Sequence, residues 1–91
     1  MYTLLTTPGY DEELRQIEAG AGQLAQLLEQ SVYHILRRNP RLGRQTSSSD
    51  LWLIRRKVIP DLLLVQVLYR IDEAQQTVTL VSIRSVNMTI L

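Results

Sequence analysis

An Asn39-Pro40 pair divides this chain into a helical N-terminal part and a strand-rich C-terminal part. The residue before a proline avoids the helical region of the backbone, so a helix reaching this point must end there. Before the pair, apolar residues recur every three or four positions, which indicates one buried helical face. After it, apolar and polar residues alternate in runs separated by turn residues, which indicates strands. The chain is therefore predicted to have an α+β fold.

The first residues predict a short strand followed directly by a helix. Residues 2–6 are mostly apolar or β-branched, as is typical of strands. Thr7 can cap a helix, and Pro8 suits the first helical position because its missing N–H would be unpaired there anyway. Asp11 and Glu12 then fall near the first turn, where carboxylates favour the helix dipole.

A single apolar helical face extends from this helix to the Asn39-Pro40 pair. Glycines at positions 20 and 22 interrupt it, and glycine is costly in a helix interior. We therefore predict two helices, near 8–19 and 23–38, joined as a hairpin; one long helix is the alternative. The apolar face consists of Leu14, Ile17, Ala21, Leu24, Leu28, Val32 and Ile35.

Three strands are predicted after a polar loop at 41–50, near 51–58, 62–71 and 77–84. Together with the N-terminal strand they would form one largely antiparallel sheet, with the helices on one face. Side chains alternate across a strand, so the faces can be assigned from the sequence. The residues predicted to be buried under the helices are Leu14, Ile17, Leu24, Leu28, Val32, Ile35, Val65, Val67, Tyr69, Val81 and Ile83.

The opposite sheet face would carry many aliphatic side chains. The alternation places Leu62, Leu64 and Leu68 there from one strand, and Val78 and Leu80 from the next. The run 51–58 is compatible with either orientation. An exposed apolar sheet face usually marks a partner site, so we expect these residues to contact another protein.

Charge is distributed unevenly along the chain. Residues 1–36 carry five acids and one base, whereas residues 37–57 carry seven bases and one acid. Such a block favours anionic partners. For Arg37 and Arg38 we favour the explanation that they complement a helix C-terminus. Three adjacent bases are unusual inside a strand, so the run 55–57 is predicted to be a functional patch.

Composition excludes several classes of site. The chain has 91 residues and is predicted to form one domain, 1–91. It has no cysteine, and His34 is its single histidine, so disulfides, thiolate sites and histidine metal clusters are excluded. No apolar run is long enough to cross a membrane, and no secretory signal is recognisable. We expect a cytoplasmic protein without a cofactor or a metal.

The order of the elements, the Asn39-Pro40…Gly43 signal and the strand-like run Leu68–Asp72 together resemble the RelE/ParE superfamily. These are toxins of bacterial type II toxin–antitoxin systems. The resemblance covers nearly the whole chain. It implies that a cognate antitoxin neutralises the protein. It also implies one of two activities, since one branch cuts messenger RNA on the ribosome and the other poisons DNA gyrase.

The nuclease branch uses cations around the open sheet face, with a nearby residue that accepts the proton of the 2′-hydroxyl. In that branch an arginine typically lies three residues before the position of Tyr69, where this chain has Gln66. No tyrosine, histidine or lysine follows the last predicted strand. His34 lies far away in sequence and is predicted to be a structural or surface residue. If the chain is a nuclease, the cations would be Arg55, Arg56, Lys57, Arg70 and Arg84.

The incomplete nuclease site favours a toxin that acts by binding, with DNA gyrase as the target. A ribosome-dependent messenger RNA endonuclease is the alternative, and a non-toxic member that only binds the antitoxin is another. The antitoxin, or a second copy of the chain in its absence, is expected on Leu62, Leu64, Leu68, Val78 and Leu80, beside Arg70 and Arg84. Alternatively, the apolar tail 88–91 covers this face within one molecule.

Overall fold

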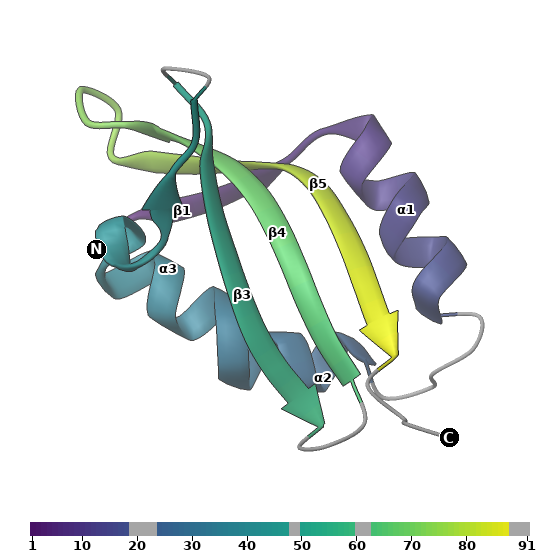
Figure 1. Ribbon diagram of the computed structural model, residues 1–91. Coiled ribbons are helices and arrows are strands. Elements are labelled where there is room, and N and C mark those ends of the chain that lie inside the picture. The colour runs from purple at the N-terminus through teal and green to yellow at the C-terminus, as the bar shows by residue number, and fades with distance from the viewer. Residues whose placement is uncertain (19–23, 48–49, 60–62, 88–91) are drawn as a thin grey trace.

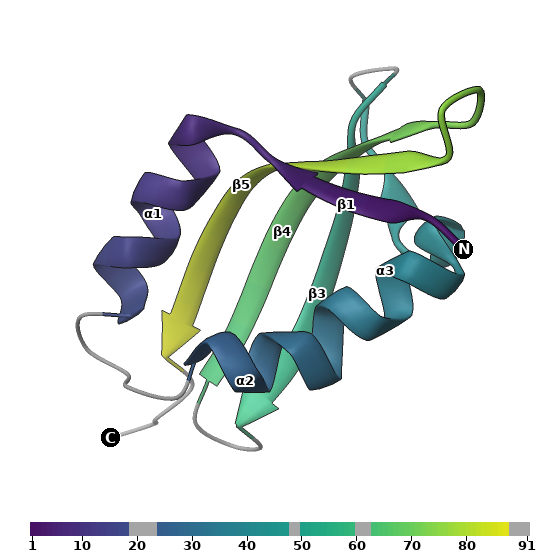
Figure 2. The same cartoon turned by 180° about the vertical axis from the view of Figure 1, so that it is seen from behind.

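The computed structural model describes residues 1–18, 24–47, 50–59 and 63–87. It confirms the α+β fold, with one five-stranded sheet whose order is β1-β5-β4-β3-β2 (Figure 1). β1 pairs with β5 in parallel, and all other neighbours are antiparallel. The helices lie together on one side of this sheet (Figures 1 and 2). The strands are β1 Thr3–Thr6, β2 Arg44–Gln45, β3 Trp52–Ile59, β4 Leu63–Asp72 and β5 Thr77–Asn87.

The first helix, α1, spans Pro8–Glu18 and begins as the sequence predicted. The backbone N–H of Tyr10 donates to Thr7 Oγ1 at 3.1 Å, which caps the first turn. The second helical rod runs from Leu24 to Arg38 and ends directly before Asn39-Pro40, also as predicted. The joint between the two rods, with its glycines, falls in 19–23 and lies outside the described residues.

The second rod is not a uniform α-helix. It consists of α2 Leu24–Leu28, a π-helical segment η1 Glu29–Tyr33, and α3 His34–Arg38. The N–H of His34 donates to the carbonyl of Glu29, five residues earlier, which is the π-helical bond. A π-turn inserts one residue and shifts every later side chain around the axis. The residue fully buried after Val32 is consequently Leu36, and the prediction of Ile35 at this position was wrong: Ile35 is only half-buried.

Most of the predicted core is confirmed. Val65, Val67 and Tyr69 of β4 and Ile83 of β5 are at most 1% exposed and pack against the buried residues of the second rod. Leu14 and Ile17 of α1 are half-buried at the margin of this core. In β3, whose orientation the sequence left open, Ile54 and Val58 face the helices.

A β-bulge in β5 overturns the predicted face of its first half. Leu68 pairs with Ser82, but Tyr69 pairs with Leu80, so Val81 is an extra residue in the ladder. One inserted residue moves every side chain on one side of it to the other sheet face. Val78 and Leu80 are therefore at most 1% exposed in the core, and their predicted place on the open face was wrong. Val81 is half-buried instead of fully buried.

Different elements lie along the two edges of the sheet. β1 pairs with β5 only from Thr77 to Leu80. Beyond that point α1 lies along β5 (Figure 2), and the Glu13 carboxylate accepts the N–H of Ile83 at 3.3 Å. At the other edge β2 has only two residues and pairs with Trp52 and Leu53 of β3. This short strand lies in the segment predicted to be a loop.

The predicted turn after the second rod is held by a buried tyrosine. Pro40–Leu42 form a 3₁₀ turn, and Tyr69 Oη donates to the carbonyl oxygen of Pro40. Gly43 follows at a very close approach, since a Cβ placed there would lie 2.2 Å from Tyr69 Oη and 2.6 Å from the carbonyl oxygen of Leu53. None of the described helices is long and apolar enough to cross a membrane.

Candidate binding surface on the open face of the sheet

The candidate site is the sheet face turned away from the helices, which we call the open face. The strand register aligns its side chains in three transverse rows. The central row consists of Arg55, Gln66 and Arg84, from β3, β4 and β5. On one side of it lies the row Leu53–Leu68–Ser82, and on the other the row Lys57–Leu64–Val86.

The central row places a neutral amide between two cations. Arg55 Nε donates to Gln66 Oε1 at 3.0 Å, which fixes the arginine above β4. Adjacent strands are about 4.8 Å apart, so the backbones bearing Arg55 and Arg84 are separated by roughly 10 Å. A shallow pocket of about 250 Å³ opens beside the row, lined by Leu53, Gln66, Leu68, Ser82 and Arg84. The row can therefore receive an anion against a partly apolar floor.

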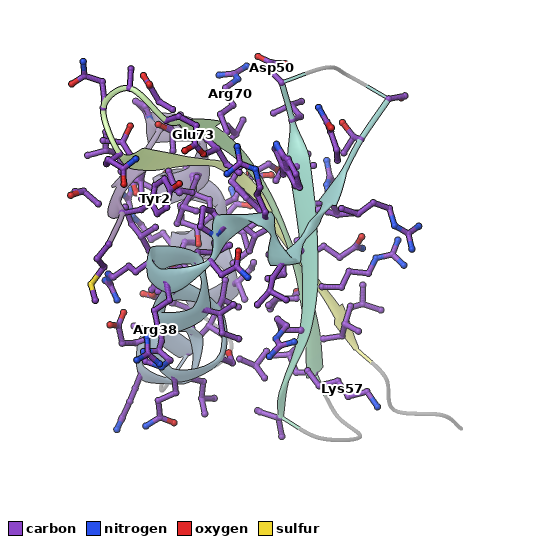
Figure 3. All side chains as sticks on the ribbon, turned by 90° about the vertical axis from the view of Figure 1, so that its left-hand side faces the viewer. Tyr2, Arg38, Asp50, Lys57, Arg70 and Glu73 are labelled. Carbon is purple, nitrogen blue, oxygen red and sulfur yellow. The ribbon has the colours of Figure 1, made fainter. Side chains whose placement is uncertain are left out.

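Several of the chain's other bases are already paired with acids. Arg37 pairs with Glu29, and Arg41 Nη1 lies 2.8 Å from a Glu73 carboxylate oxygen. Arg70 Nε lies 3.1 Å from Asp50 Oδ2, and Figure 3 shows the two residues together at one end of the molecule. These exposed pairs contribute little to stability. They do reduce the positive charge available to a partner at these positions.

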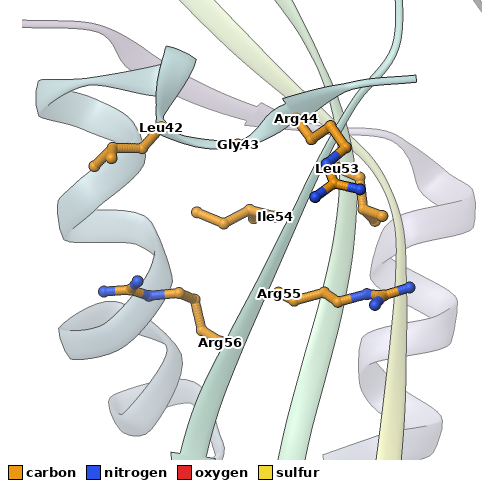
Figure 4. A pocket seen from close by; sticks show the side chains of 7 residues that line it. All are labelled: Leu42, Gly43, Arg44, Leu53, Ile54, Arg55 and Arg56. Atoms are coloured by element: carbon orange, nitrogen blue, oxygen red, sulfur yellow. The ribbon is translucent and has the colours of Figure 1, made fainter. Parts of the chain in front are cut away.

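Apart from Arg38 on α3, the remaining bases lie on β2, β3 and β5. Within the described residues, no carboxylate forms an ion pair with Arg44, Arg55, Arg56, Lys57 or Arg84. Figure 4 shows Arg44 and Arg55 directed to one side of β3 and Arg56 to the other. Arg56 Nε donates to the carbonyl oxygen of Ser31 on the π-helical segment at 3.4 Å.

The structure therefore separates the cations predicted for a nuclease. Arg55, Lys57 and Arg84 share the central part of the open face. Arg56 lies on the helix side of β3, and Arg70 lies beyond the bulge with Asp50 as its partner. The run 55–57 is thus not one patch, because successive strand residues point to opposite faces.

Among the described residues, no tyrosine or histidine that could act as a base lies beside the central row. Tyr69 is completely buried on the helix side, and burial raises the pKa of its phenol to about 12. His34 is exposed on α3. In the three described rows there is no histidine, carboxylate or tyrosine. Among its described residues, this part of the open face has cations that can hold an anion but none of these three residue types to accept a proton.

Only some of the residues predicted to contact a partner lie on the open face. Leu64 and Leu68 lie half-buried on the open face beside Leu53, and Val86 is exposed there. Val78 and Leu80 belong to the core, while Leu62 and the tail 88–91 lie outside the described residues. Leu53 was not predicted on the open face. Its alternation with Arg55 and Lys57 indicated this position, but the run 51–54 is apolar throughout and hid the alternation.

Metal binding has no support in the described part of the chain, which contains no cluster of three or more histidine, cysteine or acidic residues suited to an ion. Buried polar side-chain atoms without a hydrogen-bond partner, which can indicate a missing ligand, are also absent from the described residues.

Comparison with known proteins finds a similar fold among solved structures. The solution structure of conserved hypothetical protein HP0892 from Helicobacter pylori is similar to this chain, with a TM-score of 0.61 and 17% sequence identity. The match covers 92% of this chain and 93% of that one. At this identity the likeness shows a distant relationship of fold alone. No model of a protein family matches the sequence, and no curated protein does.

Proposed function

We propose that this chain is the toxin-type component of a bacterial type II toxin–antitoxin system, with a fold of the RelE/ParE kind, and that it acts in the cytoplasm by binding a target. The observation that carries the proposal is the central row, in which cations flank Gln66 and the described residues of the three rows include no histidine, carboxylate or tyrosine. The element order and the fold-level likeness to HP0892 are compatible with it.

The chemistry of the row favours binding over cleavage. Cutting RNA at a 2′-hydroxyl needs a base within hydrogen-bond reach and cations that stabilise the charged phosphorane. Arg55, Lys57 and Arg84 meet the second need. The Gln66 amide cannot meet the first, because its oxygen is neutral and already accepts a hydrogen bond from Arg55. DNA gyrase, a large enzyme that works on an anionic polymer, is the target we propose.

A cognate antitoxin would neutralise the protein by covering the open face. Leu53, Leu64 and Leu68 offer it an aliphatic floor, while Arg84 and Arg55 offer partners to acidic side chains. Charge complementarity of this kind mainly speeds encounter and fixes orientation. Without the antitoxin, a second copy of the chain would cover the same floor.

The second candidate is a messenger RNA endonuclease, and one observation favours it. Arg55, Lys57 and Arg84 lie on the same sheet face, and Arg84 lines a small pocket there, so cations are available to stabilise a scissile phosphate. In this case a base would have to come from the ribosome, the substrate or residues outside the described part of the chain.

Induced expression in bacteria tests both candidates. Growth, the DNA-damage response and the integrity of messenger RNA are measured with and without the neighbouring antitoxin gene. Arrest with DNA damage and intact messenger RNA supports the binding toxin. Cleavage at the ribosomal A site that disappears in Arg84→Ala supports the nuclease. Arg38→Ala is the matched control, since Arg38 is exposed on α3, away from the sheet (Figure 3). Normal growth in every arm would contradict both.

A further inference from the structure

The edge of β3 beyond Leu53 lacks a neighbouring strand in the described structure. β2 reaches only as far as the pair Arg44–Leu53 and then turns away through Gly43. Figure 3 looks onto this edge, and no described strand lies in front of β3 from there towards Lys57. On its other side, the same stretch is fully paired with β4 from Ile54 to Lys57. The sheet is therefore ready to accept one more strand at this edge.

The direction of the backbone groups can be worked out from the β2 hairpin. The N–H of Thr46 donates to the carbonyl oxygen of Leu51 at 2.9 Å, so the polar groups of Leu51 point to the β2 side. These groups alternate along a strand, so those of Leu53, Arg55 and Lys57 point the same way. The carbonyl oxygen of Leu53 faces Gly43, which is consistent with this direction. At Arg55 and Lys57 none of the described strands pairs with these groups.

A hollow occupies the place that a longer β2 would fill. It has a volume of about 380 Å³ and is lined by Leu42, Gly43 and Arg44 above and by Leu53 to Arg56 along β3 (Figure 4). Leu42 is 60% exposed at its rim, and Ile54 forms the apolar part of its wall on the helix side. An extended segment laid against β3 would place alternate side chains beside Ile54 on one face and beside Arg55 and Lys57 on the other.

The charges on this edge decide which segment fits. Arg55, Arg56 and Lys57 have no carboxylate ion-pair partner among the described residues. Two copies of β3 joined edge to edge would set base against base, which is unfavourable. Within this chain the densest run of acids, 11–13, is part of α1 and is not extended. Both the self-pairing of β3 and pairing with that run are thereby disfavoured.

We propose that the β3 edge binds an extended acidic segment of another protein, which adds a sixth strand to the sheet. The segment alternates acidic residues, facing Arg55 and Lys57, with aliphatic residues, facing Ile54 and Leu42. Main-chain hydrogen bonds supply affinity and the alternating side chains supply selectivity, as in other cases of strand addition. This interaction does not require toxicity, and it uses the strand edge instead of the open-face floor. The competing explanation is that the bases only protect an exposed edge from aggregation.

The free protein gives the first test. Amide hydrogen exchange, followed by NMR, should be fast at Arg55 and Lys57 and slow at Ile54 and Arg56, whose N–H groups face β4. The probe is then a seven-residue peptide of alternating glutamate and valine. Its addition should slow exchange at Arg55 and Lys57 and shift their amide signals. Slow exchange at these two amides in the free protein would overturn the proposal, because the edge would already be occupied.

Two controls separate strand addition from simple charge attraction. A peptide that is N-methylated at its glutamates keeps every charge but loses the N–H groups that would face β3, so its affinity should fall about tenfold or more. A peptide with lysine in place of glutamate should not bind. If the N-methylated peptide binds as well as the parent, the interaction is only electrostatic and the proposal fails. If neither the parent peptide nor the N-methylated peptide binds at low salt, the bases only protect the edge from aggregation and the proposal also fails.

The protein side is tested by a matched pair of variants. Arg55→Pro removes the edge-facing N–H together with the charge, and proline is tolerated where the N–H of an edge strand faces solvent. Arg55→Ala removes the same charge and keeps the N–H. We expect Arg55→Pro to weaken peptide binding about tenfold more than Arg55→Ala. Equal weakening would contradict strand addition. The peptide controls retain their meaning if Arg55→Pro does not fold, and growth assays of the proposed toxin are independent of all these results.

Discussion

Replacing Gly43 with alanine should destabilise the protein, although the backbone conformation there suits any residue. Gly43 has φ −72° and ψ −173°, in the extended region. Where the native conformation is permitted, glycine-to-alanine changes usually stabilise by about 0.4–1 kcal/mol, because they restrict the unfolded chain. At Gly43 the opposite is expected, because a Cβ would lie 2.2 Å from Tyr69 Oη and 2.6 Å from the Leu53 carbonyl oxygen.

The magnitude follows from how little these two neighbours can move. The Tyr69 side chain is fully buried, and Leu53 is fixed between β2 and β4. The alanine must displace the 3₁₀ turn, which is overpacking and costs roughly 2–3 kcal/mol. Tyr69→Phe alone removes the hydrogen bond to Pro40 and costs about 1–2 kcal/mol. It also removes the closest clashing atom, so the double variant should cost about 1 kcal/mol less than the sum of the single changes.

Urea denaturation followed by the fluorescence of Trp52, the single tryptophan, measures all four proteins of this cycle. Thermal midpoints provide a second measurement, since 1 kcal/mol corresponds to about 4–8 °C for a domain of this size. Gly9→Ala is the control: a Cβ there meets only Thr7 Oγ1 at 3.9 Å, and the residue lies in the first turn of α1. It should be neutral or slightly stabilising. Strict additivity, or a Gly43→Ala variant as stable as Gly9→Ala, would refute the reasoning.

Three further predictions concern the core, the helix cap and alkaline pH. Leu80→Ala should cost about 2–5 kcal/mol of unfolding free energy, clearly more than Leu68→Ala. The reason is that the bulge buries Leu80, whereas Leu68 lies on the open face. Equal losses would contradict the bulge. Thr7→Ala should cost about 1 kcal/mol through loss of the cap on Tyr10, and Thr7→Ser should restore most of it in the same urea assay. Burial raises the pKa of Tyr69 to about 12, above its ordinary value near 10, so the folded state favours the neutral phenol. Its contribution to stability is present below about pH 10 and is lost as the pH rises through about 12. Urea midpoints should therefore fall above about pH 10, and less steeply in Tyr69→Phe; identical pH profiles would count against it.

The contacts that the sequence predicted correctly are mostly short-range. Thr7 and Pro8 specify the start of α1, because capping involves groups within three residues of each other. Asn39-Pro40 specifies the end of the second rod through a local steric clash. The strict alternation Val65, Val67, Tyr69 identifies the buried face of β4, because this strand is regular up to Tyr69. These elements were enough to predict an α+β fold with the helices on one face of the sheet.

Errors arose wherever one residue was inserted into a regular element. The π-turn at Glu29–Tyr33 exchanged Ile35 for Leu36 in the core, and the bulge at Val81 moved Val78 and Leu80 from the predicted binding face into the core. Neither insertion has a local sequence signal, since both depend on how two elements fit against each other. The π-turn lies against β3, and the bulge lies where β5 passes from β1 to α1.

The candidate site was the part least determined by sequence. The run Arg55-Arg56-Lys57 indicated a basic strand. Only the pairing of β3 and β5 with β4 decided that Arg55 and Arg84 lie on either side of Gln66. The Asp50 partner of Arg70 and the burial of Tyr69 under the Pro40 turn are likewise contacts across 20 and 29 residues. Sequence periodicity specifies which side chains share a face of one element. Which faces meet, and therefore which charges remain free to bind a partner, is decided by the packing of the whole sheet.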